Sequence, residues 1–564
     1  AVGVNALKDQ TFATASDFYN VAVGSDAGKS ITSGQFNTFI GGLSGDALAA
    51  ADYNTAVGYA SGGALTTGTQ NLLVGAFAGD ALTDADFNTA VGYGALDSDT
   101  LGSRSTAIGR SALSLQNFTT ATDTYNVAVG FETGKAVTTG TENTLIGGLA
   151  GDALTTGIRN VAVGSVALSS DVAGQNNVAI GYGALFAQNF TTATNAYNVA
   201  VGASSGAAIT TGFANVVVGG LSGDALTTGS SNTALGHESL SADTLGSHNV
   251  AVGHSALKAQ NFTTATDAYN TAIGADAGTA ITTGASNTLI GGLAGDALTD
   301  ADLNTAVGYQ ALSSDTLGSR STAMGQGSLF SQNFTTATNT YNTAYGFHSG
   351  LSVTTGVRNT LLGGQAGDAI TDGDDNTFLG YQAGTYQHDL TTGDFCTIVG
   401  AFSTTTSTNA QIAAGLGYNL DCAGGFTTLG QGSTDIRAEH GVATWATVSD
   451  ERYKKDITDS TLGLSFINAL KPRTFKYKNK GDLPSTFSAY EEGSSEVYKF
   501  PETQHGFIAQ EVKTAIDADS GVADGFRLWD ERDDGSQEVA EAALIPVLVK
   551  AIQELTARVA ALES

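Results

Sequence analysis

The chain has 564 residues and a net charge of −30, from 24 Lys and Arg against 54 Asp and Glu. This length predicts several domains or one long repeated domain, and so acidic a surface repels a phosphate backbone, so we expect no nucleic-acid partner. No apolar run approaches the length of about 18 residues that a membrane span needs, and no charged-then-apolar leader opens the chain, so we expect no membrane insertion and no visible secretory signal.

Charge and proline divide the chain near residue 449. Residues 1–448 contain 10 Lys and Arg, 33 Asp and Glu, and no proline. Residues 449–564 contain 14 Lys and Arg, 21 Asp and Glu, and all four prolines. We therefore expect two different structures in one chain. The two cysteines, Cys396 and Cys422, are too few for a disulfide framework or a four-ligand zinc site, and we expect no cofactor.

The first part repeats Asn-x-x-x-Gly with a 17-residue period, as at Asn20, Asn37, Asn54, Asn71 and Asn88. After Ser105, which takes the next place, a 21-residue step leads to Asn126, and the steps then run 17, 17, 17 and 21. The longer step always contains Gln-Asn-Phe-Thr-Thr-Ala-Thr, at 116–122, 188–194, 260–266 and 332–338. One coil of structure therefore corresponds to one 17-residue repeat, and every fourth coil is longer by four.

Each repeat has a short β-branched or apolar strand that ends at Gly, followed by small residues. Short strands between Gly and Asn predict a mainly β fold, a parallel β-roll or solenoid shaft over residues 1–396, with coils about 4.8 Å apart and Asn side chains bonded from coil to coil. A slim roll leaves one face uncovered, so we expect lateral association of identical chains. The period fails after residue 396, which predicts a loop-rich neck over 397–448.

The Asn-Thr-Ala-Val-Gly-Tyr-x-Ala-Leu units of the shaft resemble the head repeats of trimeric autotransporter adhesins and related phage fibre shafts. This resemblance implies left-handed parallel β-rolls packed three around an axis. The 17-residue period found here is longer than the period of that family.

Three features of the shaft are candidate sites. A Gly-Asp-Ala-Leu/Ile column favours Asp residues that cap turns over Asp residues that bind a metal; its members are Asp46, Asp80, Asp152, Asp224, Asp296 and Asp368. His237, His254 and His348 stand alone in sequence, which favours solvated or packed histidines. The Thr-rich inserts could contact a host-surface glycan or protein, although Thr is also a good strand residue. We predict no metal site and no enzymatic activity for the shaft.

The second part carries several motifs in order. They are Ser-Asp-Glu-Arg-Tyr-Lys-Lys-Asp at 449–456, Leu-Lys-Pro at 470–472, Phe-Lys-Tyr at 475–477 and His-Gly-Phe-Ile-Ala-Gln-Glu-Val at 505–512. This set closely resembles the C-terminal intramolecular chaperone domain of phage endosialidases, the peptidase S74 family. The resemblance implies a small α+β domain over 449–564 that drives trimer assembly of the preceding shaft and then removes itself with a Ser-Lys dyad. Ser449 takes the place of the nucleophile and Lys454 that of the base.

A serine hydroxyl needs a neighbouring base, and a lysine serves as one only when burial or nearby cations favour its neutral form. Arg452 and Lys455 are such cations, and trimer packing could supply the burial. The alternative is an ordinary solvated helix start with Ser449 as N-cap. Attack through a five-membered ring favours cleavage at Val448–Ser449, while attack from elsewhere could open Ser449–Asp450.

His505 has two interpretations, as a residue packed beside Phe507 and Ile508, which we favour, or as an accessory polar group of the peptidase. The chain ends in a predicted helix over 538–563. Its apolar residues alternate by three and four, a coiled-coil seam of Ile545, Leu548, Ile552, Leu555, Val559 and Leu562. Such a seam needs a partner but does not by itself select three strands, so the trimer is expected from the resemblance and the shaft.

These observations predict a homotrimeric tail fibre or adhesin-like appendage of a virion. Its C-terminal domain would direct trimer assembly and register and then act once, as a self-cleaving serine peptidase next to Ser449. The alternative is a bacterial surface adhesin of the same architecture that retains its C-terminal domain.

Overall fold

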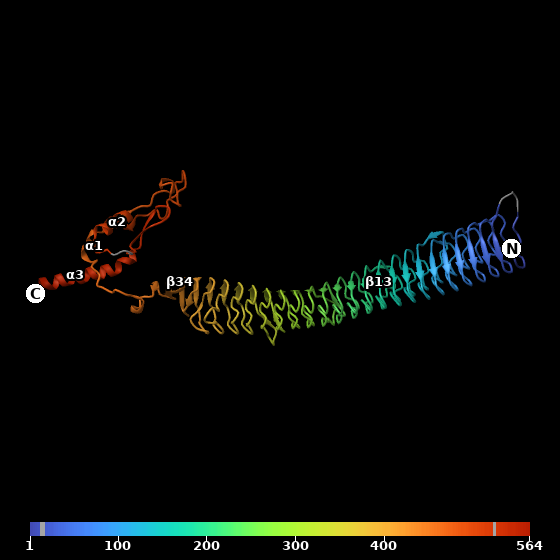
Figure 1. Ribbon diagram of the computed structural model, residues 1–564, viewed down its shortest axis with the longest axis horizontal. Coiled ribbons are helices and arrows are strands. Elements are labelled where there is room, and N and C mark those ends of the chain that lie inside the picture. The colour runs from blue at the N-terminus through green and yellow to red at the C-terminus, as the bar shows by residue number, and fades with distance from the viewer. Residues whose placement is uncertain (12–16, 523–525) are drawn as a thin grey trace. The chain divides into compact units, whose positions relative to one another are not determined.

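The computed structural model describes residues 1–11, 17–522 and 526–564. The chain divides into two compact units, Ala1–Val448 and Ser449–Ser564. In Figure 1 the first unit, coloured from blue to orange, is a long stack of coils, and the second, in orange and red, contains the helices. Among the described residues, we find no helix with the length and apolar character to cross a bilayer.

In the described part of the first unit, one long sheet contains 26 strands, and all of them except β35 and β36 pair in parallel. The parallel strands are β1 (Val21–Val23), β2 (Thr38–Ile40), β3 (Thr55–Val57), β4 (Leu72–Val74), β5 (Thr89–Val91), β7 (Thr106–Ile108), β9 (Val127–Val129), β10 (Thr144–Ile146), β11 (Val161–Val163), β13 (Val178–Ile180), β15 (Val199–Val201), β16 (Val216–Val218), β17 (Thr233–Leu235), β19 (Val250–Val252), β21 (Thr271–Ile273), β22 (Thr288–Ile290), β23 (Thr305–Val307), β25 (Thr322–Met324), β27 (Thr343–Tyr345), β28 (Thr360–Leu362), β29 (Thr377–Leu379), β30 (Thr397–Val399), β32 (Ala414–Tyr418) and β34 (Phe426–Gln431). Strands about 4.8 Å apart make this stack about 110 Å long. The predicted parallel β-solenoid is confirmed.

The register of the sheet follows the sequence repeat. Thr144 pairs with Val161, the equivalent residue one repeat later, and Val178 pairs with Val199 across a longer coil. The middle residue of each three-residue strand points inward and is buried, as Ala128 and Leu145 show. The core of the shaft is therefore one column of Ala, Leu, Val, Ile and Phe side chains, with Leu, Ile and Val from the turns packed beside it.

Buried asparagines bond successive coils together, as the sequence predicts. The Asn143 backbone N–H donates to Asn126 Oδ1 at 3.0 Å, and the Asn143 side-chain amide donates to Gly157 O at 2.9 Å. Its own Oδ1 accepts from the Asn160 backbone N–H at 3.0 Å. We call this column the Asn ladder; its members are Asn20, Asn37, Asn54, Asn71, Asn88, Asn126, Asn143, Asn160, Asn177, Asn198, Asn215, Asn232, Asn249, Asn270, Asn287, Asn304, Asn342, Asn359 and Asn376. It satisfies backbone groups that the thin core would otherwise leave unpaired.

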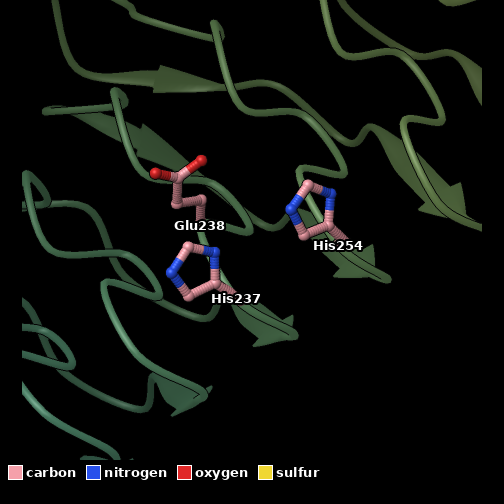
Figure 2. A group of neighbouring side chains, drawn as sticks. All are labelled: His237, Glu238 and His254. Carbon is pink, nitrogen blue, oxygen red and sulfur yellow. The ribbon is translucent and has the colours of Figure 1, made fainter.

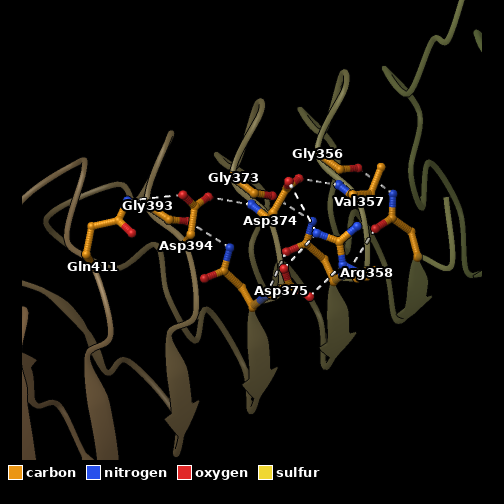
Figure 3. Close-up of polar contacts among 12 residues, drawn as sticks. Gly356, Val357, Arg358, Gly373, Asp374, Asp375, Gly393, Asp394 and Gln411 are labelled. Atoms are coloured by element: carbon orange, nitrogen blue, oxygen red, sulfur yellow. Dashed lines mark hydrogen bonds and ion pairs between the residues drawn. The ribbon is translucent and has the colours of Figure 1, made fainter.

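Aspartates beside the Asn ladder bond the coils in the opposite direction (Figure 3). The Val357 backbone N–H donates to Asp374 Oδ1 at 2.8 Å, and the Asp374 backbone N–H donates to Asp394 Oδ1 at 2.8 Å. Each of these aspartates thus accepts a hydrogen bond from a backbone N–H of the preceding coil. An asparagine of the ladder accepts its hydrogen bond from a backbone N–H of the following coil. The Arg358 guanidinium also forms a bidentate ion pair with Asp375 of the next coil, with N–O distances of 2.7 and 2.8 Å.

Two of the longer coils, which begin with Ser105 and Ser321 in place of asparagine, carry a substitute for the ladder. At Ser105, which lacks the amide, Gln116 of the insert donates to Ser105 Oγ at 2.8 Å and to the buried carboxylate of Asp99 at 2.5 Å. Gln116 Oε1 then accepts from the Asn126 amide at 2.8 Å, which resumes the ladder. Each longer coil also adds a pair of two-residue parallel strands: β6 (Gly102–Ser103) with β8 (Thr122–Asp123), β12 (Gly174–Gln175) with β14 (Thr194–Asn195), β18 (Gly246–Ser247) with β20 (Thr266–Asp267), and β24 (Gly318–Ser319) with β26 (Thr338–Asn339).

The parallel ladder continues beyond residue 396, so a loop-rich neck over 397–448 does not describe this segment. β30 pairs with β32 and β32 with β34, because the strand-then-Gly pattern persists after Asn is lost. Cys396 occupies the next ladder position, and its backbone N–H donates to Asn376 Oδ1 at 3.0 Å. The segment also contains β31 (Thr404–Thr405), β33 (Asp421–Cys422) and the turn η1 (Gly432–Thr434), and it ends in antiparallel β35 (Ile436–Glu439) and β36 (Ala446–Thr447).

In the second unit, described over 449–522 and 526–564, three helices and two hairpins pack around a small core centred on Phe466, Val512, Leu528 and Val547. Its elements are η2 (Glu451–Tyr453), α1 (Leu464–Ala469), β37 (Arg473–Phe475), η3 (Lys480–Asp482), β38 (Gln504–Gly506), α2 (Ala509–Ala518), β39 (Trp529–Glu531), β40 (Gln537–Val539), η4 (Glu541–Leu544) and α3 (Ile545–Glu563). The last helix begins at Ile545 and not at 538, because residues 537–539 pair with β39. Pro546 lies in its first turn, where no N–H is needed.

The glycine that ends each strand is required by the stacking. Gly164 has φ +139°, and a Cβ there would lie 2.4 Å from the Gly181 carbonyl oxygen. Around a Cβ at Gly148 there is nothing within 4 Å. We expect Gly164→Ala to lower the free energy of unfolding by about 1–3 kcal/mol or more, and Gly148→Ala to change it by no more than about 0.5 kcal/mol. Denaturation midpoints of the two variants check this, and equal midpoints would contradict it.

Several carboxyl groups of the Gly-Asp column are costly to ionise. Burial raises the pKa of Asp152, Asp224 and Asp296. Within the described residues, one oxygen of each of these three side chains is buried and has no hydrogen-bond partner. Because the folded shaft holds these protons more tightly than the unfolded chain does, its stability falls as the pH rises above the ordinary Asp range near pH 4.

We therefore expect the triple variant Asp152→Asn, Asp224→Asn and Asp296→Asn to unfold at a higher temperature than the wild type at neutral pH. The gain shrinks toward pH 4, where the wild-type carboxyls take up protons. Melting curves at several pH values measure this. A control variant that changes the exposed Asp84 and Asp300 to Asn should follow the wild-type profile.

Candidate active site

The chain immediately after Val448 forms a tight turn that brings Lys454 back toward Ser449. Asp450 caps the turn η2 by accepting the Arg452 backbone N–H at 2.8 Å, and the Lys454 backbone N–H closes it by donating to Glu451 O at 2.9 Å. Asp450, and not Ser449, is therefore the N-cap, so the interpretation of Ser449 as a helix cap is wrong. The Ser449 hydroxyl is left for another partner.

That partner is Lys454. Its Nζ donates a hydrogen bond to Ser449 Oγ at 2.6 Å. A nucleophile and a base need this separation for proton transfer. The two residues chosen from the sequence, five positions apart, are thus in direct contact. Both side chains are exposed in the single chain.

The charged neighbours Asp450 and Arg452 pair with each other. The Arg452 guanidinium binds the Asp450 carboxylate with both prongs, at 3.0 and 2.7 Å, and these hydrogen bonds hold the pKa of Asp450 below its usual value. Asp450 is therefore already paired. Because Val448 is 56% exposed and Ser449 is also at the surface, the bonds on both sides of Ser449 are open to attack.

His505 lies in another part of the second unit. It stands on β38 opposite Thr474 and, with Arg473, Phe507 and Glu541, lines an open depression of about 560 Å³. The residues that line this depression include neither Ser449 nor Lys454. An accessory role in the peptidase therefore has no contact to support it among the described residues.

The two cysteines offer no alternative nucleophile. Cys396 and Cys422 are buried in the first unit and form no disulfide. Burial raises the pKa of both thiols, that of Cys422 to about 12. Thiols held in this way are protonated at neutral pH and unreactive.

Sequence reasoning missed one cluster in the shaft. His237 and His254 do not stand alone, because their rings stack 5.7 Å apart on successive coils, next to Glu238. The 17-residue spacing between the two histidines was the signal, since residues one repeat apart lie side by side. His348 stacks instead on its neighbour Phe347.

Comparison with known proteins agrees with the sequence resemblance. Residues 449–520 match the model of a family, Peptidase S74, described as the chaperone of endosialidase. The match begins at Ser449 and ends before the β39–β40 hairpin and α3. Searches of curated proteins and of solved structures gave no match. The matched domain and the β-solenoid shaft together fit an architecture of the tail-fibre and endosialidase type.

Proposed function

We propose that this chain is a homotrimeric, tail-fibre-like protein of a virion whose second unit directs assembly of the shaft and then detaches by cutting the chain next to Ser449. The observation that carries the proposal is the 2.6 Å contact between Lys454 Nζ and Ser449 Oγ, at the first residue of the matched domain. The cleavage site coincides with the boundary between the two units.

The contact supports a single-turnover acyl transfer. Lys454, as a neutral amine, takes the hydroxyl proton while Ser449 Oγ attacks the carbonyl carbon of Val448. The C–N bond breaks, the Ser449 amine leaves with a proton, and an ester joins Val448 to the serine oxygen. Water then hydrolyses the ester and separates the two pieces. Attack on the Ser449–Asp450 bond by a hydroxyl from elsewhere is the alternative.

Exposure of the pair supports coupling between assembly and cleavage. A lysine in water carries a proton that a base must lack, and burial favours the neutral form. Ser449 and Lys454 are both exposed in the single chain. Packing of three chains around this turn would cover Lys454, so the peptidase would act only after the subunits have met.

Two uncovered apolar surfaces support association of identical chains. Along the shaft, the first and third residues of the strands face outward, and many are β-branched, with Val21 47% and Leu235 46% exposed. On α3, the predicted seam is exposed along its whole length, from Ile545 to Leu562. A neighbouring face of α3 is buried at Val547 and Ala551, and Val547 belongs to the core of the second unit. On each surface the exposed apolar residues recur at regular intervals along an axis, as they do in an interface between parallel copies of a chain.

Recognition of a host surface would fall to the shaft. Each longer coil presents an exposed Thr-Thr-Ala segment, as at 119–121, and these segments recur with a 72-residue period. Near the start of the shaft, Tyr19, Phe36 and Tyr53 form an exposed stack of rings 5.4 and 4.9 Å apart. Flat aromatic faces and rows of hydroxyls are suited to a glycan or a protein surface.

The self-cleavage is tested with three variants of the full chain. We expect the wild type to yield two fragments, while Ser449→Ala and Lys454→Ala remain whole or cleave at least about 100-fold more slowly, the range of a lost general base. Lys478→Ala, which changes an exposed lysine of the second unit away from the pair and its neighbouring cations, should cleave as the wild type does. Intact mass and the N-terminal sequence of the small fragment identify the bond. A wild-type chain that stays whole as a native oligomer would favour the retained bacterial adhesin.

The assembly role is tested on the α3 seam. Ile552→Asp with Leu555→Asp places two charges on it, and we expect the fraction of trimer to fall several-fold relative to the wild type. Gln553→Asp, an exposed position on the same turn but off the seam, should assemble normally. Light scattering of freshly expressed protein gives the molar mass, and a wild type that is monomeric at micromolar concentration would contradict the trimer.

A further inference from the structure

Two successive coils of the shaft place two imidazoles and a carboxylate at one point on the surface. His237 and Glu238 directly follow β17 and Gly236, and His254 follows β19 and Gly253 in the next coil. Figure 2 shows the three side chains grouped beside the ends of these strands. One ligand atom from each lies within 4.8 Å of the others.

The stacking rule of the shaft fixes this arrangement. The two histidines occupy equivalent positions one repeat apart, so their rings lie nearly parallel, 10° between planes and 5.7 Å between centroids. The same position holds Gly220 in the coil before and Ala275 in the coil after, so small side chains flank the pair. The backbone therefore holds the ligands in place before any ion arrives.

The chemistry of the three groups selects a class of ion. Two imidazoles and one carboxylate are the donor set of three-ligand zinc sites, with the remaining position open to water. Imidazole nitrogen also suits copper and nickel, whereas magnesium and calcium prefer oxygen alone. The carboxylate of Asp276 lies 3.8 Å from His254 Nδ1, in the place of an outer partner that orients a metal-binding histidine.

A lysine forms an ion pair with the carboxylate of this three-residue cluster. Lys258 Nζ donates to Glu238 Oε2 at 2.6 Å, and this hydrogen bond is the first cause of the lowered pKa of Glu238. An ion would use the other carboxylate oxygen or displace the lysine, whose flexible chain is exposed. Lys258 is thus a competitor of the ion, and its removal should strengthen binding.

From this geometry we propose that His237, Glu238 and His254 bind one divalent transition-metal ion per chain, zinc being the best fit, and that the ion cross-links two coils of the shaft. This site is independent of the peptidase and of trimer assembly, since all its ligands come from one chain.

The test is calorimetric titration of the full chain with Zn²⁺ near neutral pH, with Mg²⁺ as a second titrant. We expect one Zn²⁺ per chain and no uptake of Mg²⁺. His237→Ala and His254→Ala should each weaken zinc binding by at least about 10-fold, the lower end of what even an outer partner contributes. Lys258→Ala should bind more tightly. His248→Ala is the matched control, since His248 is an exposed histidine of the same region that stacks on Tyr269.

A second readout separates this site from loose surface binding. Zinc should raise the unfolding temperature of the wild type and of His248→Ala, because an ion that binds only the folded coils stabilises them. It should not raise that of His237→Ala or His254→Ala. All of these substitutions are at exposed positions, so the variants are expected to fold. Equal zinc binding by the wild type and His237→Ala, or no binding by the wild type at millimolar zinc, would overturn the proposal.

Discussion

The structure of the shaft depends on one interaction, the hydrogen bond from the backbone N–H of one coil to the buried side-chain oxygen of an asparagine in the coil before. The core inside each coil is thin, and its apolar contacts are non-directional, so apolar burial alone does not set how successive coils line up. The Asn ladder fixes both the orientation and the spacing of successive coils, because a buried amide group without its hydrogen-bond partner costs about 1–3 kcal/mol. A longer coil that begins with asparagine keeps this bond directly, as Asn177 does with the Asn198 backbone N–H, whereas a longer coil that begins with serine relies on a glutamine of the insert. Gln116 reaches the place that an asparagine amide would fill, so the four extra residues of the longer coil leave the ladder continuous.

The same regularity creates a problem for assembly. Every coil presents nearly the same strand, the same asparagine and the same outward β-branched residues, so chains displaced by one repeat would find almost equivalent contacts. Stacking of coils within a chain is fixed by sequence order, but alignment between chains is not. Under the proposed function, the non-repetitive second unit, with its own exposed seam on α3, would select one alignment between chains, which the repeats alone cannot do. The longer coils, one in four, reduce the number of equivalent registers but do not remove the degeneracy, because they recur as well.

Much of this could be predicted from the sequence, and the failures have physical causes. The 17-residue period predicted the parallel solenoid and the Asn ladder, because an asparagine at the same position of each repeat fixes how successive coils stack. The Ser449 and Lys454 pair came from the order of several motifs, and the structure brings the two side chains together through a turn capped by Asp450, which the motif alone did not indicate. The coils beyond residue 396 do not follow from the asparagine repeat, because the asparagine is lost there while the strand-then-Gly pattern persists. His237 and His254 were judged as single residues, although in a solenoid a residue one period away is a nearest neighbour.

Removal of an assembly domain makes physical sense only if the shaft can hold its register without it. In the proposed trimer, a shift by one repeat would require every contact between the aligned chains to open at once, since the shaft is a stack of coils bonded in both directions by asparagine and aspartate. Such a structure persists because the barrier to rearrangement is high, whatever the free energy of the shifted forms. The alignment domain is then needed only while the first contacts form. A peptidase pair that lies at the surface of the single chain, and becomes a working base and nucleophile only when neighbours cover it, would tie the cut to the moment when alignment is complete.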